Sequence, residues 1–215
     1  MDSHPPNVKR KRGYDASRRR ELARRNQAKI VEHAELRFLR DGYATVTVAA
    51  IAADADVSPD TIYKSFGGKP GLVRAIRTRA LQGTSPLPAE QRSDELHAAQ
   101  SDPRVIIEAW GALTAEITPR VSPILLLIRD AAATDPEVRS LLEEMDADRL
   151  RRMTQNARRL LDAGHLRPGI ELAQAADVLW TYSSHELYEL LVLRRGWTPQ
   201  RYGRFIAAAM IEALL

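Results

Sequence analysis

Helix-capping side chains followed directly by proline recur along this chain, and they restrict its fold more than any other feature. Asp, Ser and Thr accept a hydrogen bond from the first turn of a helix, and proline fits that turn because an N–H there has no helical partner. The pattern occurs at Ser58-Pro59, Asp102-Pro103, Ser122-Pro123, Asp135-Pro136 and Thr198-Pro199. Apolar residues recur at helical spacing between these points, and no convincing strand alternation appears. The sequence therefore predicts an all-α fold of about nine helices, three short ones among the first four.

The expected helices are bounded by these caps, by glycines and by prolines. They cover about 17–40, 47–55, 58–66, 70–81, 102–118, 122–132, 134–163, 171–195 and 198–215. The stretch GTSPLPAEQRSD (83–94) is rich in Pro, Ser and Gly and is the clear linker candidate. We therefore expect a small N-terminal domain and a larger C-terminal one.

Composition excludes several classes of protein. The 215 residues are 44% hydrophobic and contain no cysteine, which rules out disulfide scaffolds and thiolate metal sites. The polar, basic N-terminus is unlike a secretory signal. No apolar run approaches the roughly 20 residues of a membrane span, FIAAAMI being among the longest. A cytoplasmic location is expected.

Charge is distributed unevenly. Residues 1–80 hold 17 Lys and Arg against 9 Asp and Glu, whereas the rest holds 15 against 19. A basic module on a mildly acidic body indicates that the first part meets a polyanion; a basic solvated tail without a partner is the alternative. Residues 1–16, with the run Lys9-Arg10-Lys11-Arg12, are expected to be a disordered basic arm.

The segment TVAAIAADADVSPDTIYKSF (47–66) predicts two short helices packed across a tight turn. Its apolar residues form one packing set and leave the polar face of the second helix outside the core. Such a helix can enter a major groove while the first helix crosses the backbone. The pattern is moderately specific, because two short helices of any bundle could mimic it.

The residues Thr-Val-x-x-Ile-Ala-x-x-Ala-x-Val-Ser-x-x-Thr-Ile-Tyr-x-x-Phe, followed by Gly-x-Lys-x-x-Leu, resemble the DNA-binding domain of the TetR family of bacterial transcriptional regulators. The motif runs from Thr47 to Leu72, and the preceding helix with Phe38 and Gly42-Tyr43 fits as well. The resemblance implies a helix-turn-helix DNA-binding domain over 17–81 and an effector-binding and dimerisation domain over 82–215. It implies no cofactor, and it indicates a ligand-responsive repressor acting as a homodimer on a near-palindromic operator.

The same resemblance, together with the basic arm, implies a set of residues that contact double-stranded DNA. They are Arg10, Arg12, Arg18, Thr47, Ser58, Pro59, Asp60, Thr61, Tyr63, Lys64, Ser65 and Lys69. Tyr63 and Lys69 would bind phosphate, the latter with help from a helix N-terminus. The arm can lie along phosphates or enter a narrow minor groove, or it can be a solubilising tail.

Two aspartates depart from the family pattern, since Asp56 and Asp60 stand where glycine is frequent. Asp tolerates a positive φ, so Asp56 can make the turn at modest cost. Asp60 either sits on the positive end of its helix or accepts from a cytosine amino group. The glycine pair before Lys69 lacks the spacing of a nucleotide-binding loop and is expected to be a turn.

The last two long helices are rich in apolar and small residues, and the resemblance implies a four-helix dimer interface there. Its candidates are Leu179, Leu187, Leu190, Phe205, Ile206, Ala209, Met210 and Leu214. An intrachain core is the alternative for these faces.

Helices between about 102 and 190 are expected to enclose an apolar effector pocket. Its candidates are Trp110, Leu113, Leu126, Arg129, Met153, Asn156, Trp180, Tyr182, Ser183 and His185. Each could instead be core or surface. Arg129 follows ILLLI, so if buried it needs an anionic partner from the chain or from a ligand.

Two other functions compete with this interpretation. A helical enzyme is disfavoured because the histidines show no metal spacing and Ser183-Ser184-His185-Glu186 lie on one helix, where neighbours point apart. A nucleoid-type protein that binds DNA without sequence preference is supported by the arm but not by an ordered groove-facing helix. The sequence indicates neither the effector nor the operator.

Overall fold

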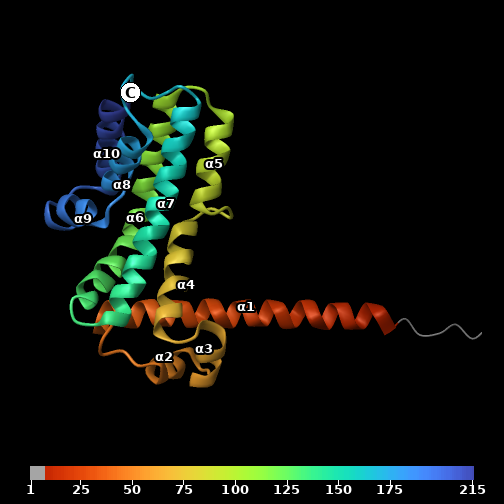
Figure 1. Cartoon of the computed structure of the whole chain (residues 1–215). Helices are drawn as coiled ribbons and strands as arrows, with labels where there is room; N and C mark the ends of the chain where they lie inside the picture. Colours follow the sequence, from red (N-terminus) through yellow and green to blue (C-terminus); the bar gives the residue numbers. More distant parts are fainter. Residues whose placement is uncertain (1–7) are drawn as a thin grey trace, which may run out of the picture. The chain divides into compact units, whose positions relative to one another are not determined.

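The computed structural model describes the backbone of residues 8–215, and the side chains of residue 18 and residues 20–215. The described chain is helical throughout its regular elements (Figure 1), which confirms the all-α prediction. The elements are α1 (Val8–Asp41), α2 (Val48–Ala55), α3 (Pro59–Phe66), α4 (Lys69–Gln82), α5 (Ala89–Ala99), α6 (Pro103–Ala132), α7 (Pro136–Asp162), α8 (Leu172–Tyr182), α9 (His185–Tyr188), the π-helical segment η1 (Glu189–Arg194) and α10 (Pro199–Leu214).

The chain forms two compact units that divide within α4, one up to Ala75 and one from Ile76 to Leu215. The expected division at 81/82, beside the linker candidate 83–94, differs from this. Within 83–94, residues from Ala89 onward already belong to α5. Pro88 precedes that helix, and Ala89 and Ser93 are its buried residues.

The first unit is built on the C-terminal half of α1. Ile30, Ala34 and Phe38 recur at helical spacing there and are at most 1% exposed. Helix α1 packs on α2, and α2 packs on α3, where Ile51 and Ile62 are fully buried as well. The Phe38 and Tyr43 rings lie 5.3 Å apart, so the turn after α1 is fixed to the same core.

The start of α1 differs from the prediction for residues 1–16. The helix begins at Val8 rather than near Ser17, so residues 8–16 are helical and not disordered. Residues 1–7 lie outside the described part of the chain. Lys and Arg, which make up the run 9–12, are good helix formers, and the expectation of disorder left this out.

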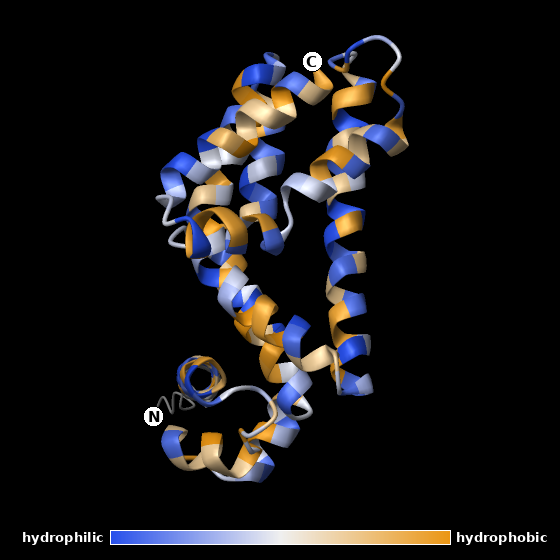
Figure 2. Cartoon of the chain, turned by 90° about the vertical axis from the view of Figure 1, so that its left-hand side faces the viewer, coloured by the Kyte–Doolittle hydropathy of each residue, from blue (hydrophilic) through white to orange (hydrophobic). Residues whose placement is uncertain are grey.

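The second unit is a helical bundle in which α6 packs most extensively on α10, and α7 on α6 and α8. Figure 2 shows apolar and polar residues interleaved along these helices, as in helices that bury one face. The core contains Ile106, Ile107, Leu160, Tyr202 and Ile206, each fully buried.

A pair of glycines sets the closeness of α6 and α10. A Cβ on Gly111 would lie 2.5 Å from the Gly203 carbonyl oxygen, and a Cβ on Gly203 would meet the Gly111 carbonyl in the same way. Only glycine at both positions lets the two backbones approach this far.

The predicted break near 119–122 is wrong, because α6 runs unbroken from Pro103 to Ala132 through Pro119 and Pro123. Each proline removes one backbone hydrogen bond without ending the helix. Ser122 is fully buried and pairs with a side chain from another helix, so it does not cap a new helix.

The predicted helix 171–195 is also wrong, since the chain breaks at Ser183-Ser184. Ser184 caps α9 by accepting from the Leu187 N–H at 3.5 Å, and α9 passes into η1. Short π-helical segments occur often at functional sites.

Helix α6 is long and apolar enough, by length and composition, to cross a membrane. This differs from the expectation that no such stretch exists. Its apolar face supplies Ile106, Ile107, Ile124 and Ile128 to the protein core, each with no exposed surface. The core position accounts for the composition of the helix.

Candidate functional site

Helices α2 and α3 are joined by a turn whose geometry depends on three capping residues. The Thr47 hydroxyl accepts from the Ala50 N–H at 3.1 Å and starts α2. Asp56 ends α2 in the left-handed conformation, with φ of 56°, as predicted for this position. The Ser58 hydroxyl accepts from the Thr61 N–H at 3.2 Å and starts α3. The pair therefore has helix-turn-helix geometry.

One face of α3 is open to solvent. Ile62 is buried beneath it, whereas Pro59, Asp60, Tyr63, Lys64 and Ser65 are exposed. Thr61 is partly buried, and its hydroxyl lies 2.9 Å from that of Ser58. Of the predicted arm residues, Arg18 is exposed on α1. The side chains of Arg10 and Arg12 lie outside the described part.

Asp60 has a partner that the sequence analysis did not consider. Its carboxylate lies 2.6 Å from the Lys64 ammonium one turn along α3, and both side chains are exposed. Asp60 is also the acidic residue in the first turn of the helix. Its position is thus compatible with the helix dipole interpretation, and it additionally neutralises the one lysine on this face of α3.

Lys69 lies differently from the prediction that it binds phosphate. Its ammonium donates to the Tyr43 carbonyl at 2.7 Å and sits 4.2 Å from the centre of the Tyr43 ring. The side chain is partly buried. In this structure Lys69 joins the start of α4 to the turn after α1. The glycine pair before it forms a turn with positive φ at Gly67 and Gly68.

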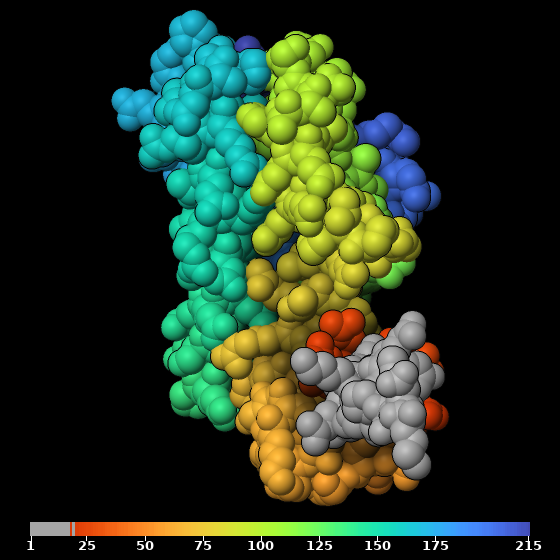
Figure 3. All heavy atoms as spheres, turned by 90° about the vertical axis from the view of Figure 1, so that its right-hand side faces the viewer, coloured from red at the N-terminus to blue at the C-terminus, as the bar shows by residue number. Residues whose placement is uncertain are grey.

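The second unit contains a cavity of about 580 Å³, lined by residues between Arg77 and Met210. Figure 3 shows the face on which α5 and α7 flank it. Helices α6 and α7 supply more than half of the lining residues, and the surface of the wall is mostly apolar. The size and lining are those of a small-molecule site.

Most of the predicted effector residues line this cavity. They are Trp110, Leu113, Leu126, Arg129, Met153, Asn156, Trp180, Ser183 and His185. Tyr182 does not line it; it packs against the core instead. Whether any of them contacts a ligand stays a prediction.

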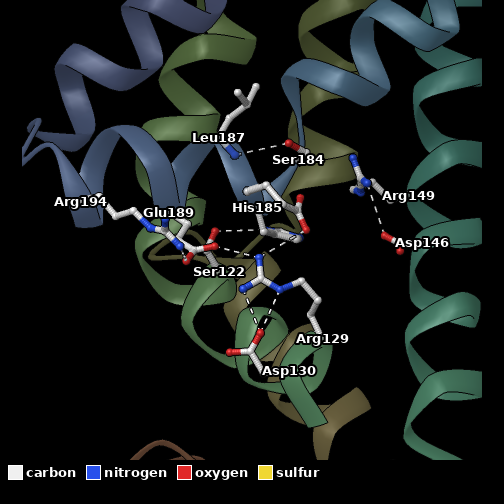
Figure 4. A network of polar contacts seen from close by, with 11 residues as sticks. Ser122, Arg129, Asp130, Asp146, Arg149, Ser184, His185, Leu187, Glu189 and Arg194 are labelled. Atoms are coloured by element: carbon white, nitrogen blue, oxygen red, sulfur yellow. Dashed lines mark hydrogen bonds and ion pairs between the residues drawn. The ribbon is translucent and has the colours of Figure 1, made fainter. Parts of the chain in front are cut away.

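Arg129 finds its anionic partners within the chain. Its guanidinium donates to Glu189 at 2.8 Å and to Asp130 at 2.9 Å (Figure 4). The hydrogen bond that Arg129 donates to Glu189 is the main reason that the pKa of Arg129 is raised. Arg194 donates to the same Glu189 at 2.6 Å within η1, so it is the bond from Arg129 that joins α6 to η1.

His185 and Ser122 form a hydrogen-bonded pair in the cavity wall, with Nδ1 and Oγ 3.0 Å apart. Burial, and then the charges of Arg149 and Arg77, lower the pKa of His185 to about 3. The imidazole is therefore neutral at physiological pH and is a poor base for activating a hydroxyl. The pair joins α6 to α9.

Arg149 is the most important wall residue that the sequence analysis missed. It donates to the Trp180 carbonyl at 2.6 Å and to the Ser183 hydroxyl at 3.0 Å, and so caps the C-terminal end of α8. It also stacks 4.5 Å from the Trp180 ring. Burial lowers the pKa of Arg149 from its ordinary value. The signal was its spacing, because Arg149 shares one face of α7 with Met153 and Asn156, which were predicted.

The predicted dimer residues divide into two groups. Leu179, Ile206, Met210 and Leu214 are at most 4% exposed and belong to the core of this one chain, which corrects their assignment to an interface. Leu187 and Ala209 are partly buried. Leu190 and Phe205 remain exposed, at 49% and 42%. Periodicity alone cannot separate a face that packs inside the chain from one that packs on a partner.

Residues 30–76 match the family model described as bacterial regulatory proteins, tetR family. This segment includes the whole α2–α3 pair and most of the first unit. A comparison with curated proteins found no match.

The fold resembles that of several solved structures. A TetR-family transcriptional regulator from Syntrophomonas wolfei has a TM-score of 0.71 at 15% identity, over 87% of this chain and 93% of that one. NalD is the secondary repressor of the MexAB-OprM multidrug efflux pump in Pseudomonas aeruginosa. It has a TM-score of 0.69 at 18% identity, over 90% of this chain and 97% of that one. The transcriptional regulator FadR from Bacillus subtilis, solved with stearoyl-CoA, has a TM-score of 0.69 at 14% identity, over 87% of this chain and 99% of that one. At these identities the likeness shows the fold alone.

Proposed function

We propose that this chain, whose residues 30–76 carry the N-terminal segment of the tetR family of bacterial regulators, is a sequence-specific transcriptional repressor that a small molecule releases from DNA. The observation that carries the proposal is the α2–α3 pair within that segment. It combines a buried inner face with an exposed α3 surface of hydroxyl groups and a lysine. Such a surface suits contacts to phosphates and to base edges in a major groove.

The residues proposed to contact DNA follow from their exposure. The exposed residues on α3 are Pro59, Tyr63, Lys64 and Ser65, and Thr47 lies at the start of α2. Arg18 on α1 adds positive charge on the same unit. Lys69 is left out of this set because it is engaged with Tyr43.

The cavity of the second unit is proposed to bind the effector. Solved structures with this fold include FadR, in complex with stearoyl-CoA, and NalD, named as a repressor, which supports the assignment by analogy. Binding shifts the protein toward a state with lower affinity for the operator, because the ligand binds the two states differently.

A homodimer is proposed as the binding unit, in the cytoplasm where the DNA is. Two recognition helices about 34 Å apart then read half-sites one helical turn apart. The exposed apolar residues Leu190, Leu193 and Phe205 are the proposed contact with the partner. Large apolar side chains left in solvent are typical of such surfaces when they cluster.

Selection of bound duplexes from a random DNA pool tests the proposal. The expected result is enrichment of a near-palindromic sequence with two half-sites. A pool that stays unenriched after repeated rounds, while the protein still retains DNA, would instead indicate nucleoid-type binding without sequence preference.

A further inference from the structure

The cavity wall holds polar atoms that have no hydrogen-bond partner within the described part of the chain. These are Ser93 Oγ, Trp110 Nε1, Asn156 Oδ1, Arg149 Nε and Trp180 Nε1. Ser93, Trp110 and Asn156 are between 5% and 7% exposed. Buried polar groups are nearly always paired in native proteins, so unpaired ones around a cavity are partners for ordered water or for a ligand that displaces it.

These atoms fall into two groups along the cavity. The first group consists of Ser93, Trp110 and Asn156. Helices α6 and α7 form an antiparallel pair about the turn 133–135, and Trp110 and Asn156 lie at similar distances from that turn. Ser93 lies at the same height along α7 as Asn156. Its neighbour Asp94 pairs with Arg152 and Arg159, which lie before and after Asn156 on that helix.

The second group consists of Arg149 and Trp180, which stack on each other. Arg149 precedes Asn156 by two turns of α7, which places the two groups about 10 Å apart along the helix. Apolar side chains such as Leu113, Met145 and Met153 line the wall as well. Among these unpaired groups the donors outnumber the acceptors. Two indole N–H groups and one guanidinium N–H only donate, one amide oxygen only accepts, and one hydroxyl can do either.

Most of the charged side chains of the wall are already paired within the chain. Arg77 pairs with Asp148 at 3.3 Å, and Arg129 with Glu189 at 2.8 Å. Arg149 pairs with Asp146 at 3.3 Å, and Arg152 with Asp94 at 2.6 Å. His185 is neutral because burial lowers its pKa to about 3. A charged ligand would have to break one of these pairs in a largely apolar cavity.

We propose that the cavity takes an elongated, uncharged and largely apolar ligand with hydrogen-bond acceptors, such as carbonyl or ether oxygens, at two points about 10 Å apart. The indole N–H of Trp110 and the Ser93 hydroxyl donate to one acceptor. The Trp180 N–H and the Arg149 Nε–H donate to the other. The Asn156 oxygen accepts from a donor on the ligand. This inference deepens the proposed function and rests on it for its regulatory meaning.

Fluorescence titration of the full chain tests the ligand class. Trp197 lies outside the cavity wall, so in a Trp197→Phe background the remaining tryptophans, Trp110 and Trp180, both report from the cavity. Three linear probes of matched length are compared, namely the diester dimethyl sebacate, the sebacate dianion and 1,10-diaminodecane. We expect saturable binding of the diester, at least about tenfold tighter than either charged probe, because only the diester avoids desolvating a charge. Tighter binding of the dianion or the diamine, or no saturable binding of the diester, overturns the proposal.

A second variant separates hydrogen bonding from apolar contact. Trp180→Phe keeps a ring in the wall but removes the N–H, and Trp110 still reports. Diester affinity should fall about fivefold, the usual effect of one lost hydrogen bond. Unchanged affinity, with the fold confirmed by thermal unfolding, means that Trp180 donates to no ligand and contradicts the assignment.

DNA binding is measured on the same protein so that the two proposals fail separately. If selected DNA is bound specifically but the diester is not bound, the ligand inference falls and the proposed function stands. If the diester binds but no DNA sequence is preferred, the proposed function falls.

Discussion

Asp60 and Lys64 face each other one turn apart on α3, with their charged groups 2.6 Å apart. An exposed pair of this kind contributes little to folding stability. Its effect on DNA binding is larger, since the carboxylate offsets the one lysine on that face and would lie near phosphates. Asp60 therefore limits how strongly α3 is attracted to any DNA.

Replacing Asp60 with Asn should free Lys64 to neutralise a phosphate. We expect tighter operator binding, and a plot of log affinity against log salt that is steeper by about one. Fluorescence anisotropy across a salt series measures this, with Glu108→Gln as the control, because it makes the same charge change at an exposed site on α6. An unchanged slope with relaxed preference at one base pair would show instead that Asp60 reads a cytosine.

Residues whose roles depend on near neighbours could be predicted from sequence. Thr47, Ser58 and Asp56 cap or turn helices through atoms within four residues, and the structure places them as predicted. Lys69 could not be predicted, because its partner Tyr43 is 26 residues away and is brought close only by the fold. The spacing of Arg149 on α7 indicates its place in the wall, but its bond to a carbonyl of α8 has no local signal.

At the scale of helices, α6 and α10 are held together by the glycine crossing. Replacing Gly203 with Ala should lower the free energy of unfolding by about 1–3 kcal/mol, because the added methyl meets the Gly111 backbone and Ala115. Thermal unfolding measures the change, and Ala208→Ser, exposed on the same helix, serves as the control. A variant as stable as the parent would show that the two helices can separate at little cost.

The Asp94 carboxylate of α5 accepts from two arginines of α7, and the Glu90 carbonyl of α5 accepts from one of them. Asp94 accepts from Arg159 and, at 2.6 Å, from Arg152. The hydrogen bond from Arg159 is the largest cause that lowers the pKa of Asp94 to about 2. The folded state therefore favours the ionised form more than the unfolded state does, and the stabilisation is present above about pH 4 and lost as the pH falls toward 2.

Replacing Asp94 with Asn should remove this pH dependence. The Asp94 side chain is 41% exposed, which weakens the effect. Between about pH 6 and pH 2 we therefore expect the free energy of unfolding of the parent to fall by only about 1 kcal/mol more than that of the variant. Urea unfolding at several pH values measures the difference. The exposed Asp177→Asn should keep the parent's acid profile, and a parallel loss in parent and Asp94→Asn would mean that Asp94 contributes nothing.

Helices were easier to predict than their breaks. Capping pairs at Asp102, Asp135 and Thr198 mark real helix starts, because the cap and its bond lie together in sequence. Pro123 does not end α6, since packing of α6 outweighs one lost hydrogen bond. The break at Ser183 is stabilised from α7 by Arg149 and therefore has no complete local signal.

At the scale of the whole molecule, the proposed dimer rests on apolar side chains that the chain leaves exposed. Leu190→Glu should shift the protein from dimer to monomer, because a carboxylate would be buried without a partner at the interface. Sedimentation equilibrium measures the change. Leu150→Glu, at a site on α7 that is 41% exposed, is the matched control and should leave the dimer intact. Dimerisation of both variants alike would place the interface elsewhere.

The central claim is specific recognition of DNA by the α2–α3 unit, and a ratio of affinities tests it most directly. The full chain is titrated at physiological salt with the duplex enriched by selection and with a shuffled duplex of the same composition. The proposal predicts binding to the selected duplex that is tighter by roughly 10³ or more. Equal affinity for the two duplexes would contradict it.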